Sequence, residues 1–397
     1  MTLLSALAGD AEIEALLSDR AQLNHMLAVE RALAEASADV GWISADAASA
    51  IAAAIDSFTP DWPDLEAGMA QDGVVVPALV RQIRRQLAEP HRAALHKGAT
   101  SQDITDTALM LQVAAVFDLY ESRLTALLSR FDELARAWAG RELIAHTRMQ
   151  VALPTTWDAK LAAWSEPLQR HLRAITAMRR SLLVVQLGGP VGDRTSFEGH
   201  GDAIAVGLAQ RLDLGLAAPW HATRDPIVAL GNLLALLSGS LGKIGADVAL
   251  LAQNEVAALR LEGGGGSSAM AHKSNPVNAE VLVALARYNG GLAGTLQQAM
   301  VHEYERSGAA WTLEWLTLPP MLITTGASLR LGLKLAEQLR LGQAGSLPLP
   351  LGERSPRSGG GGAFPQNLNP IPTRPAWRRR RSPGAGASPS ARLRHCR

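Results

Sequence analysis

The chain has 397 residues, enough for two or three domains of about 100 to 200 residues each. Its aromatic content is only 4% while Ala and Leu are abundant, which predicts an all-α fold. Residues 341–397 hold ten Arg, no Lys and one acidic residue, which leaves 28 Lys and Arg against 36 Asp and Glu, near −8, in the preceding chain. This acidic body argues against a general nucleic-acid surface.

Cysteine content and the N-terminal segment bear on the compartment. The only cysteine is Cys396, so a disulfide framework is excluded and a reducing compartment is favoured. Residues 1–10 lack the basic start of a secretory leader, and no uncharged apolar stretch approaches the roughly 18 residues of a membrane span. We therefore expect a soluble cytoplasmic protein that binds no membrane.

Apolar residues recur at helical spacing in the first half of the chain. Residues 21–38 read as one amphipathic helix, whereas Pro and Gly in residues 59–76 predict a loop-rich connection. The strongest pattern runs through residues 109–138 with spacings of three and four. Another stripe covers residues 161–185, where Pro167 predicts a kink.

A further long helix is predicted to start where Asp225 serves as N-cap and Pro226 as the first helical residue. We expect this helix to extend towards Leu261. Glu255 would then face inward with the apolar stripe, either beside a functional site or in an internal ion pair.

The lengths of these helices exceed the usual average of about 11 residues and predict an extended helical bundle. A single rod would expose its apolar stripes, so we expect rods to pack into the multi-helix core of an oligomer. The predicted domains are an N-terminal helical domain (1–90), a central long-helix bundle with the active-site segments (91–340) and a Pro/Gly/Arg-rich tail (341–397).

The tail contains nine prolines and no helical period, so it is expected to be disordered. Its exclusive use of Arg over Lys would suit a GC-rich gene read out of frame. A frameshift product and a natural disordered tail are therefore the two interpretations of residues 341–397.

The most unusual segment is residues 263–276, GGGGSSAMAHKSNP. It is not a P-loop, because His272 and not glycine precedes Lys273, and it is not a GxGxxG dinucleotide-binding turn following a strand. The segment presents hydroxyls, an ammonium group and an amide just before a helix, which suits an anionic substrate. As a plain surface loop it would still use Asn275 as N-cap and Pro276 as the first helical residue.

This segment resembles the signature loop of the fumarase/aspartase superfamily, G-S-S-x-M-P-x-K-x-N-P. Ala271 replaces the family proline, and the matching residues are Gly266, Ser267, Ser268, Met270, Lys273, Asn275 and Pro276. The resemblance implies a long helical bundle in which Ser267 exchanges a proton with the carbon next to a substrate carboxylate. It also implies that Lys273 and Asn275 bind carboxylate oxygens.

Two other segments resemble active-site regions of the same superfamily. Residues 96–103, HKGATSQD, are similar to its carboxylate-binding T-S-x-D region, although they also fit an ordinary N-cap. Residues 146–154, HTRMQVALP, are similar to its R-T-H-x-Q-x-A-x-P region with two residues exchanged. Arg148 stands at the position of the family's acid/base histidine and His146 at that of its arginine. Arg148 would act as an electrostatic clamp, and His146 remains a possible proton donor.

Substrate class is suggested by residues 302–308, followed by Trp311, Glu314 and Trp315. This stretch resembles 3-carboxy-cis,cis-muconate cycloisomerases, as do residues 72–77 and 187–192. The implied reaction, in the degradation of aromatic compounds through protocatechuate, is the internal addition of a muconate carboxylate to an alkene, giving 4-carboxymuconolactone. The implied catalytic residues are Ser267, Arg148, His146 and Lys273, and the implied substrate-binding residues are Thr100, Ser101, Gln150, Asn275, Arg306 and Ser268.

The resemblance leaves several alternatives open. Arg148 would also suit 3-sulfomuconate, a C–N lyase acting on adenylosuccinate or argininosuccinate is a second reading, and a non-catalytic structural homologue is a third. No metal-ligand cluster or cofactor motif occurs in the sequence, so neither is expected. The expected partners are a small polycarboxylate substrate and identical subunits, in a homotetramer with shared active sites.

Overall fold

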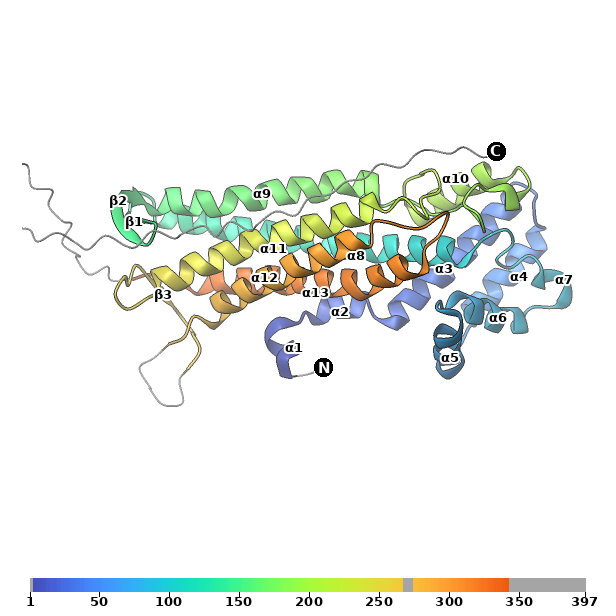
Figure 1. Ribbon diagram of the computed structural model, residues 1–397, viewed down its shortest axis with the longest axis horizontal. Helices are drawn as coiled ribbons and strands as arrows, with labels where there is room; N and C mark the ends of the chain where they lie inside the picture. The colour runs from blue at the N-terminus through green and yellow to red at the C-terminus, as the bar shows by residue number, and fades with distance from the viewer. Residues whose placement is uncertain (1–2, 267–273, 343–397) are drawn as a thin grey trace, which may run out of the picture. The chain divides into compact units, whose positions relative to one another are not determined.

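The structure, a computed structural model, describes residues 3–266 and 274–342 and is mostly helical (Figure 1). All the described residues belong to one compact unit.

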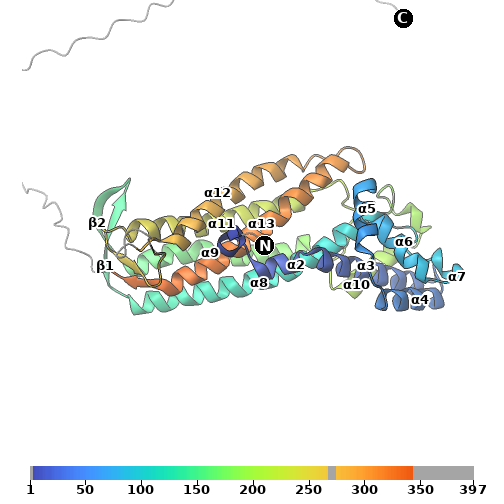
Figure 2. The ribbon, with the colours of Figure 1, turned by 90° about the horizontal axis from the view of Figure 1, so that it is seen from below.

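Long helices lying side by side form the body of this unit, as two views at right angles show (Figures 1 and 2). One hydrophobic cluster runs between them, and the predicted stripe of residues 109–138 is buried within it apart from the half-buried Leu109. The prediction of a long helical bundle is therefore confirmed. The bundle helices are α8 (Ser101–Ala137), α9 (Trp157–Leu182, containing Pro167), α11 (Asp225–Leu251), α12 (Val277–Gln298) and α13 (Gly308–Gln338).

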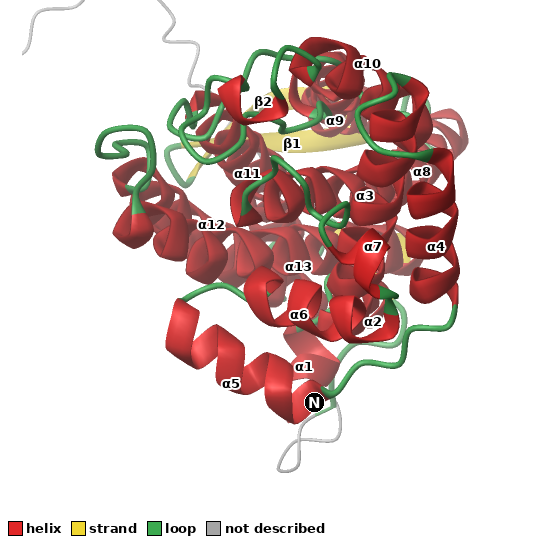
Figure 3. Cartoon of the chain, turned by 90° about the vertical axis from the view of Figure 1, so that its right-hand side faces the viewer, coloured by secondary structure: helices red, strands yellow, loops and turns green. Residues whose placement is uncertain are grey.

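Most of the shorter helices gather around the N-terminal end of α8, at the end of the bundle that faces the viewer in Figure 3. A second hydrophobic cluster lies between them, to which α8 contributes Ile104 and Ala108. The predicted helix at residues 21–38 is confirmed as α3. The elements at this end are α3 (Asp19–Asp39), α4 (Ala45–Asp56), α5 (Trp62–Asp72), α6 (Val76–Gln86), α7 (Glu89–Arg92), α10 (Gly201–Leu212) and a 3-10 turn (Thr195–Phe197). Helices α1 (Leu3–Ala8) and α2 (Ala11–Leu16) pack against the first cluster instead.

The loop expected at residues 59–76 is instead largely helix α5. The Asp61 side chain accepts a hydrogen bond from the Asp64 backbone N–H, and Pro63 lies in the first turn, where a missing N–H costs nothing. Gly73 ends the helix in the left-handed conformation, with φ of 70°. The Pro and Gly residues thus mark the ends of a helix and not a loop.

The expected ends of α11 and α12 and the expected burial of Glu255 are wrong. Helix α11 includes Asp225 as its first residue and ends at Leu251, so Glu255 lies exposed in the turn that follows. Helix α12 starts at Val277 with Pro276 at the N-cap position. Asn275 instead exchanges two backbone hydrogen bonds with Gly265, at 3.0 and 2.8 Å.

Two small antiparallel strand pairs complete the described fold. β1 (Glu142–Thr147) and β2 (Gln150–Thr156) form a hairpin between α8 and α9, and β3 (Leu259–Leu261) pairs with β4 (Leu339–Leu341). Both pairs lie at the end of the bundle where α8 finishes (Figure 1).

Among the described residues, α11 is the one helix long and apolar enough to span a membrane. The expectation that no stretch approaches that composition is therefore wrong for α11. The bundle buries 61% of its apolar window, and core helices of soluble proteins have the same composition.

Candidate active site

The predicted site residues that the structure describes lie in two groups at opposite ends of the bundle. Thr100 and Ser101 begin α8, whereas the hairpin residues His146, Arg148 and Gln150 follow its C-terminus. Helix α8 has 37 residues, which corresponds to a length of about 55 Å. One chain alone therefore does not bring both groups to one small substrate. We call the two regions the α8 N-terminal end and the hairpin end.

At the α8 N-terminal end, Thr100 is the N-cap and Ser101 the first helical residue. Both are half-buried, and the Ser101 hydroxyl has no hydrogen-bond partner within the described part of the chain. Arg306 joins this end by donating from Nη2 to the Pro190 carbonyl oxygen, at 3.1 Å. Its exposed guanidinium has no carboxylate partner among the described residues. A hydroxyl and a cation are thus available here for an anionic ligand.

Asp103, in the first turn of α8, is 1% exposed and accepts four hydrogen bonds. Oδ1 accepts from the Gly188 N–H at 2.8 Å, and the His221 Nε2 atom lies 2.9 Å from the same oxygen. Oδ2 accepts from the backbone N–H groups of Thr100 at 2.9 Å and Gly189 at 3.0 Å. The carboxylate therefore ties the start of α8 to two other segments.

One turn further along α8, a buried arginine joins two helices. Arg224, 1% exposed, donates to both oxygens of Asp106 at 2.7 and 3.2 Å. It also donates to both oxygens of Glu314 in α13, at 2.8 and 2.6 Å. Burial opposes the charged form of Arg224, but the two carboxylates outweigh it and raise its pKa. The indole N–H of Trp311 donates to Asp106 Oδ1 at 3.2 Å.

Two further histidines lie near this network. The ring of His302 is fully buried, with Nε2 3.4 Å from Glu314 Oε1 but not in hydrogen-bonding geometry, so both nitrogens lack a partner among the described residues. His96 Nδ1 lies 2.6 Å from the buried Oε1 of Glu30. Burial lowers the pKa of His96, but the charge and hydrogen bond of Glu30, with the charge of Asp103, produce a net increase.

The hairpin end presents its candidates on an exposed turn. Thr147 pairs with Gln150, so Arg148 and Met149 form a two-residue loop, with φ of 49° and 65°. Left-handed conformation at both positions matches a type I′ turn, which usually takes Asn and Gly. Holding Arg and Met there costs energy, and such strain tends to occur where a turn is functional. His146, Arg148 and Gln150 are all exposed.

The glycine-rich segment of residues 263–276 also starts and ends at the hairpin end, beside β3 and the N-terminus of α12 (Figure 1). The Gly265–Asn275 bridge closes its base. Asn275 is half-buried there. Ser267, Ser268 and Lys273 lie outside the described residues, so their predicted roles stay predictions.

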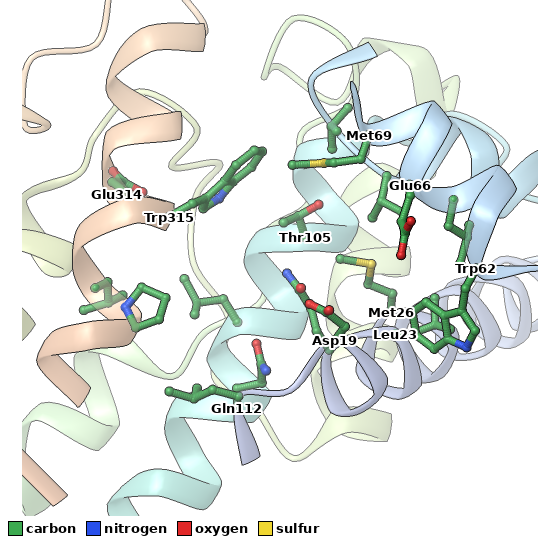
Figure 4. A pocket seen from close by; sticks show the side chains of 18 of the residues that line it. Asp19, Leu23, Met26, Trp62, Glu66, Met69, Thr105, Gln112, Glu314 and Trp315 are labelled. Carbon is green, nitrogen blue, oxygen red and sulfur yellow. The ribbon is translucent and has the colours of Figure 1, made fainter. Parts of the chain in front are cut away.

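A cavity of about 630 Å³ lies between α3, α5, α8 and α13 (Figure 4). Apolar side chains such as Met26, Trp62 and Leu318 form most of its wall. Asp19, Glu66 and Glu314 add carboxylates, and none of the described residues lining it is Lys, Arg or His. This lining does not suit a polyanionic substrate, whereas the region around Ser101 and Arg306 does.

Several buried groups of the α8 N-terminal end had no role assigned from sequence. Asp103 and Glu314 lie within the motifs already described. Arg224 directly precedes the predicted helix start at Asp225, but its pairing with Asp106 spans 118 residues of chain. Only the three-dimensional structure reveals such a long-range pairing.

Comparison with known proteins agrees with the fold and with the predicted family. Residues 10–288 match the family model described as lyase. The chain is 37% identical over 344 residues to a protein of Bradyrhizobium diazoefficiens named 3-carboxy-cis,cis-muconate cycloisomerase, covering 85% of this chain and 76% of the relative. A protein of the same name from Pseudomonas aeruginosa is 38% identical over 338 residues, covering 83% and 74%.

A solved structure gives the same result. The crystal structure of 3-carboxy-cis,cis-muconate lactonizing enzyme from Pseudomonas putida superposes with a TM-score of 0.81 at 35% sequence identity, covering 85% of this chain and 77% of that one. The expected all-α, fumarase/aspartase-like fold is confirmed. The chain belongs to the lyase family of enzymes, alongside the 3-carboxy-cis,cis-muconate cycloisomerases.

Proposed function

We propose that the protein is a 3-carboxy-cis,cis-muconate cycloisomerase that forms 4-carboxymuconolactone. A substrate carboxylate oxygen bonds to one alkene carbon, and a proton adds to the neighbouring carbon next to another carboxylate. In reverse this is a β-elimination with a carboxylate as leaving group. The observation that carries the proposal is the 35–38% identity to named enzymes of this activity across most of the chain.

The chemistry needs cations and hydrogen-bond donors, because charge builds on the carboxylate beside the carbon that exchanges its proton. Ser101 and Arg306 supply a hydroxyl and a guanidinium at the α8 N-terminal end. Arg148 supplies a second guanidinium, which is always charged and so serves as a clamp and not as a base. Ser267 is assigned the proton transfer by its place in the signature loop, supported by Lys273.

The substrate assignment is tested by following ultraviolet absorbance of the purified protein with 3-carboxy-cis,cis-muconate, 3-sulfomuconate and adenylosuccinate in separate reactions. The expected result is rapid loss of the carboxymuconate chromophore. Faster turnover of sulfomuconate would move the assignment to that substrate. Cleavage of adenylosuccinate alone would identify a C–N lyase, and no turnover by a folded protein would favour a non-catalytic homologue.

We further propose a homotetramer whose active sites combine segments from different subunits. The two groups of site residues lie at opposite ends of one bundle, so residues from both reach one substrate only if neighbouring chains meet. Exposed apolar side chains on three bundle helices support such packing: Leu236 on α11, Tyr288 on α12 and Leu316 on α13.

Subunit mixing tests the shared site. At substrate concentrations well below KM, Ser101→Ala and Arg148→Ala are each expected to be nearly inactive alone, because each damages substrate binding in every site. Random reassembly of equal amounts leaves about a quarter of the sites with both residues intact, so about a quarter of wild-type activity should return. Native mass spectrometry confirms that mixed tetramers form. Mixed tetramers without recovered activity would contradict the shared site.

A further inference from the structure

Asp103 is the point at which three separate segments of the chain meet. Its two oxygens accept from the backbone of Thr100, from the backbone of Gly188 and Gly189, and from the ring of His221. A carboxylate has only acceptors to offer, and here each oxygen serves two donors. An asparagine of equal size would turn an NH₂ group towards two of these donors, leaving them unsatisfied in a buried site.

The segments that Asp103 joins carry the candidate substrate-binding groups of this end. Thr100 directly precedes Ser101 at the start of α8. The turn at Gly188 and Gly189 leads into Pro190, whose carbonyl oxygen receives the hydrogen bond from Arg306. Asp103 therefore sets the position of the Ser101 hydroxyl relative to the Arg306 guanidinium without needing to touch the substrate.

Steric contacts leave the glycine turn little freedom to shift. A Cβ on Gly188 would lie 2.6 Å from His221 Cε1, and one on Gly189 would lie 2.2 Å from the Ser196 hydroxyl oxygen. Gly189 also has a φ of 71°, which other residues adopt only with strain. The turn thus packs directly against His221, which also forms a hydrogen bond with Asp103.

His221 orients the carboxylate. It is 3% exposed, its Nδ1 atom has no partner among the described residues, and its backbone carbonyl accepts from Gln102 Nε2 at 3.0 Å. The ring therefore forms its hydrogen bond to Asp103 through Nε2 alone. A glutamine places its amide nitrogen near the position of a histidine Nε2, so it retains this donor, whereas a leucine does not.

We propose that Asp103, oriented by His221, is the positioning residue that holds Ser101 and Arg306 at the relative positions needed to bind one substrate carboxylate. The inference rests on the proposed function for its substrate. It assigns neither residue a proton-transfer step. It predicts that loss of this carboxylate weakens substrate binding far more than it slows the reaction.

The test compares Asp103→Asn with Asp10→Asn, a matched control. Asp10 is also a buried N-cap aspartate, 1% exposed, and it pairs with Arg123 away from both groups of site residues. Both variants should lose thermal stability. Only Asp103→Asn should raise KM for 3-carboxy-cis,cis-muconate, by about tenfold or more, with kcat changed less than about threefold.

Variants of the histidine separate positioning from proton transfer. His221→Gln is expected to retain KM within about threefold of wild type, and His221→Leu to match Asp103→Asn. Equal KM values for Asp103→Asn and Asp10→Asn would overturn the proposal. A loss of kcat in His221→Gln as large as in His221→Leu would also overturn it, because the imidazole itself would then be required.

Hydrogen exchange gives a readout that needs no substrate. The amides of Thr100, Gly188 and Gly189 should lose protection in Asp103→Asn and keep it in Asp10→Asn. If the wild type fails to turn over muconate, the proposed function fails. The exchange rates of these amides still show whether Asp103 holds the segments together. Unchanged protection in Asp103→Asn would contradict the proposal whatever the substrate.

Discussion

Replacement of Ser267 by alanine is expected to lower kcat on 3-carboxy-cis,cis-muconate by about 10²- to 10⁴-fold, the usual contribution of a positioned proton-transfer group. The residue aligns with the serine of the superfamily signature loop. The carbon acid beside a carboxylate is very weak, so the reaction has no comparable route once the hydroxyl is removed. Circular dichroism and native mass spectrometry should show an unchanged fold and assembly.

Ser274→Ala is the matched control, because Ser274 is an exposed serine seven residues further along the same loop segment. Its kcat should stay within about threefold of wild type, as is usual for surface substitutions. A Ser267→Ala enzyme with a kcat similar to that of the control would exclude Ser267 as the proton-transfer residue.

Replacement of Arg224 by methionine is expected to lower the free energy of unfolding by about 3 to 5 kcal/mol. Both oxygens of Asp106 and of Glu314 accept from this one guanidinium. Without it, two carboxylates face each other in the interior with no compensating charge. Urea unfolding followed by circular dichroism measures the loss, and failure to fold would be its extreme form.

A triple variant keeps this prediction testable even if Arg224→Met does not fold. Adding Asp106→Asn and Glu314→Gln removes the two carboxylates that Arg224→Met leaves without a counter-charge. At least about 2 kcal/mol of the lost stability should therefore return. A single Arg224→Met variant that loses less than about 1 kcal/mol would show that the buried ion pairs matter little. A triple variant no more stable than the single one would contradict the electrostatic cause.

The long helices could be predicted because their cause is local. Apolar residues at helical spacing from Leu109 to Trp138 form a stripe along one face of a helix. This stripe is buried where α8 packs against the other bundle helices. The Pro and Gly residues within residues 59–76 predict a loop, yet Pro63 and Gly73 occupy the two ends of helix α5, where both residue types are common. Position within the element, and not residue type alone, decides what these residues do.

The end of α11 and the hairpin were harder to predict because their causes are not local. Residues that were expected to continue α11 form β3, which pairs with β4 about 80 residues later in the chain. Arg148 and Met149 occupy a turn for which Asn and Gly are the usual signals. The strands on either side, and not the turn residues, therefore determine this hairpin.

The candidate site could be predicted as a set of segments but not as an arrangement. Motif resemblance predicted site roles for Thr100, Ser101, Arg148 and Arg306, yet spacing along the chain gave no sign that α8 separates the first pair from Arg148. The buried network around Arg224 depends on pairings between distant residues, such as Arg224 with Asp106. Its residue types are visible in the sequence, but their partners are not.

The central claim is that the protein closes a muconate into a lactone, and nuclear magnetic resonance in D₂O tests it most directly. With 3-carboxy-cis,cis-muconate and the wild-type protein, the predicted product is 4-carboxymuconolactone carrying one deuteron on the carbon next to a carboxylate. Unchanged substrate, or a product without a lactone ring, in the presence of the folded wild-type protein would contradict the claim.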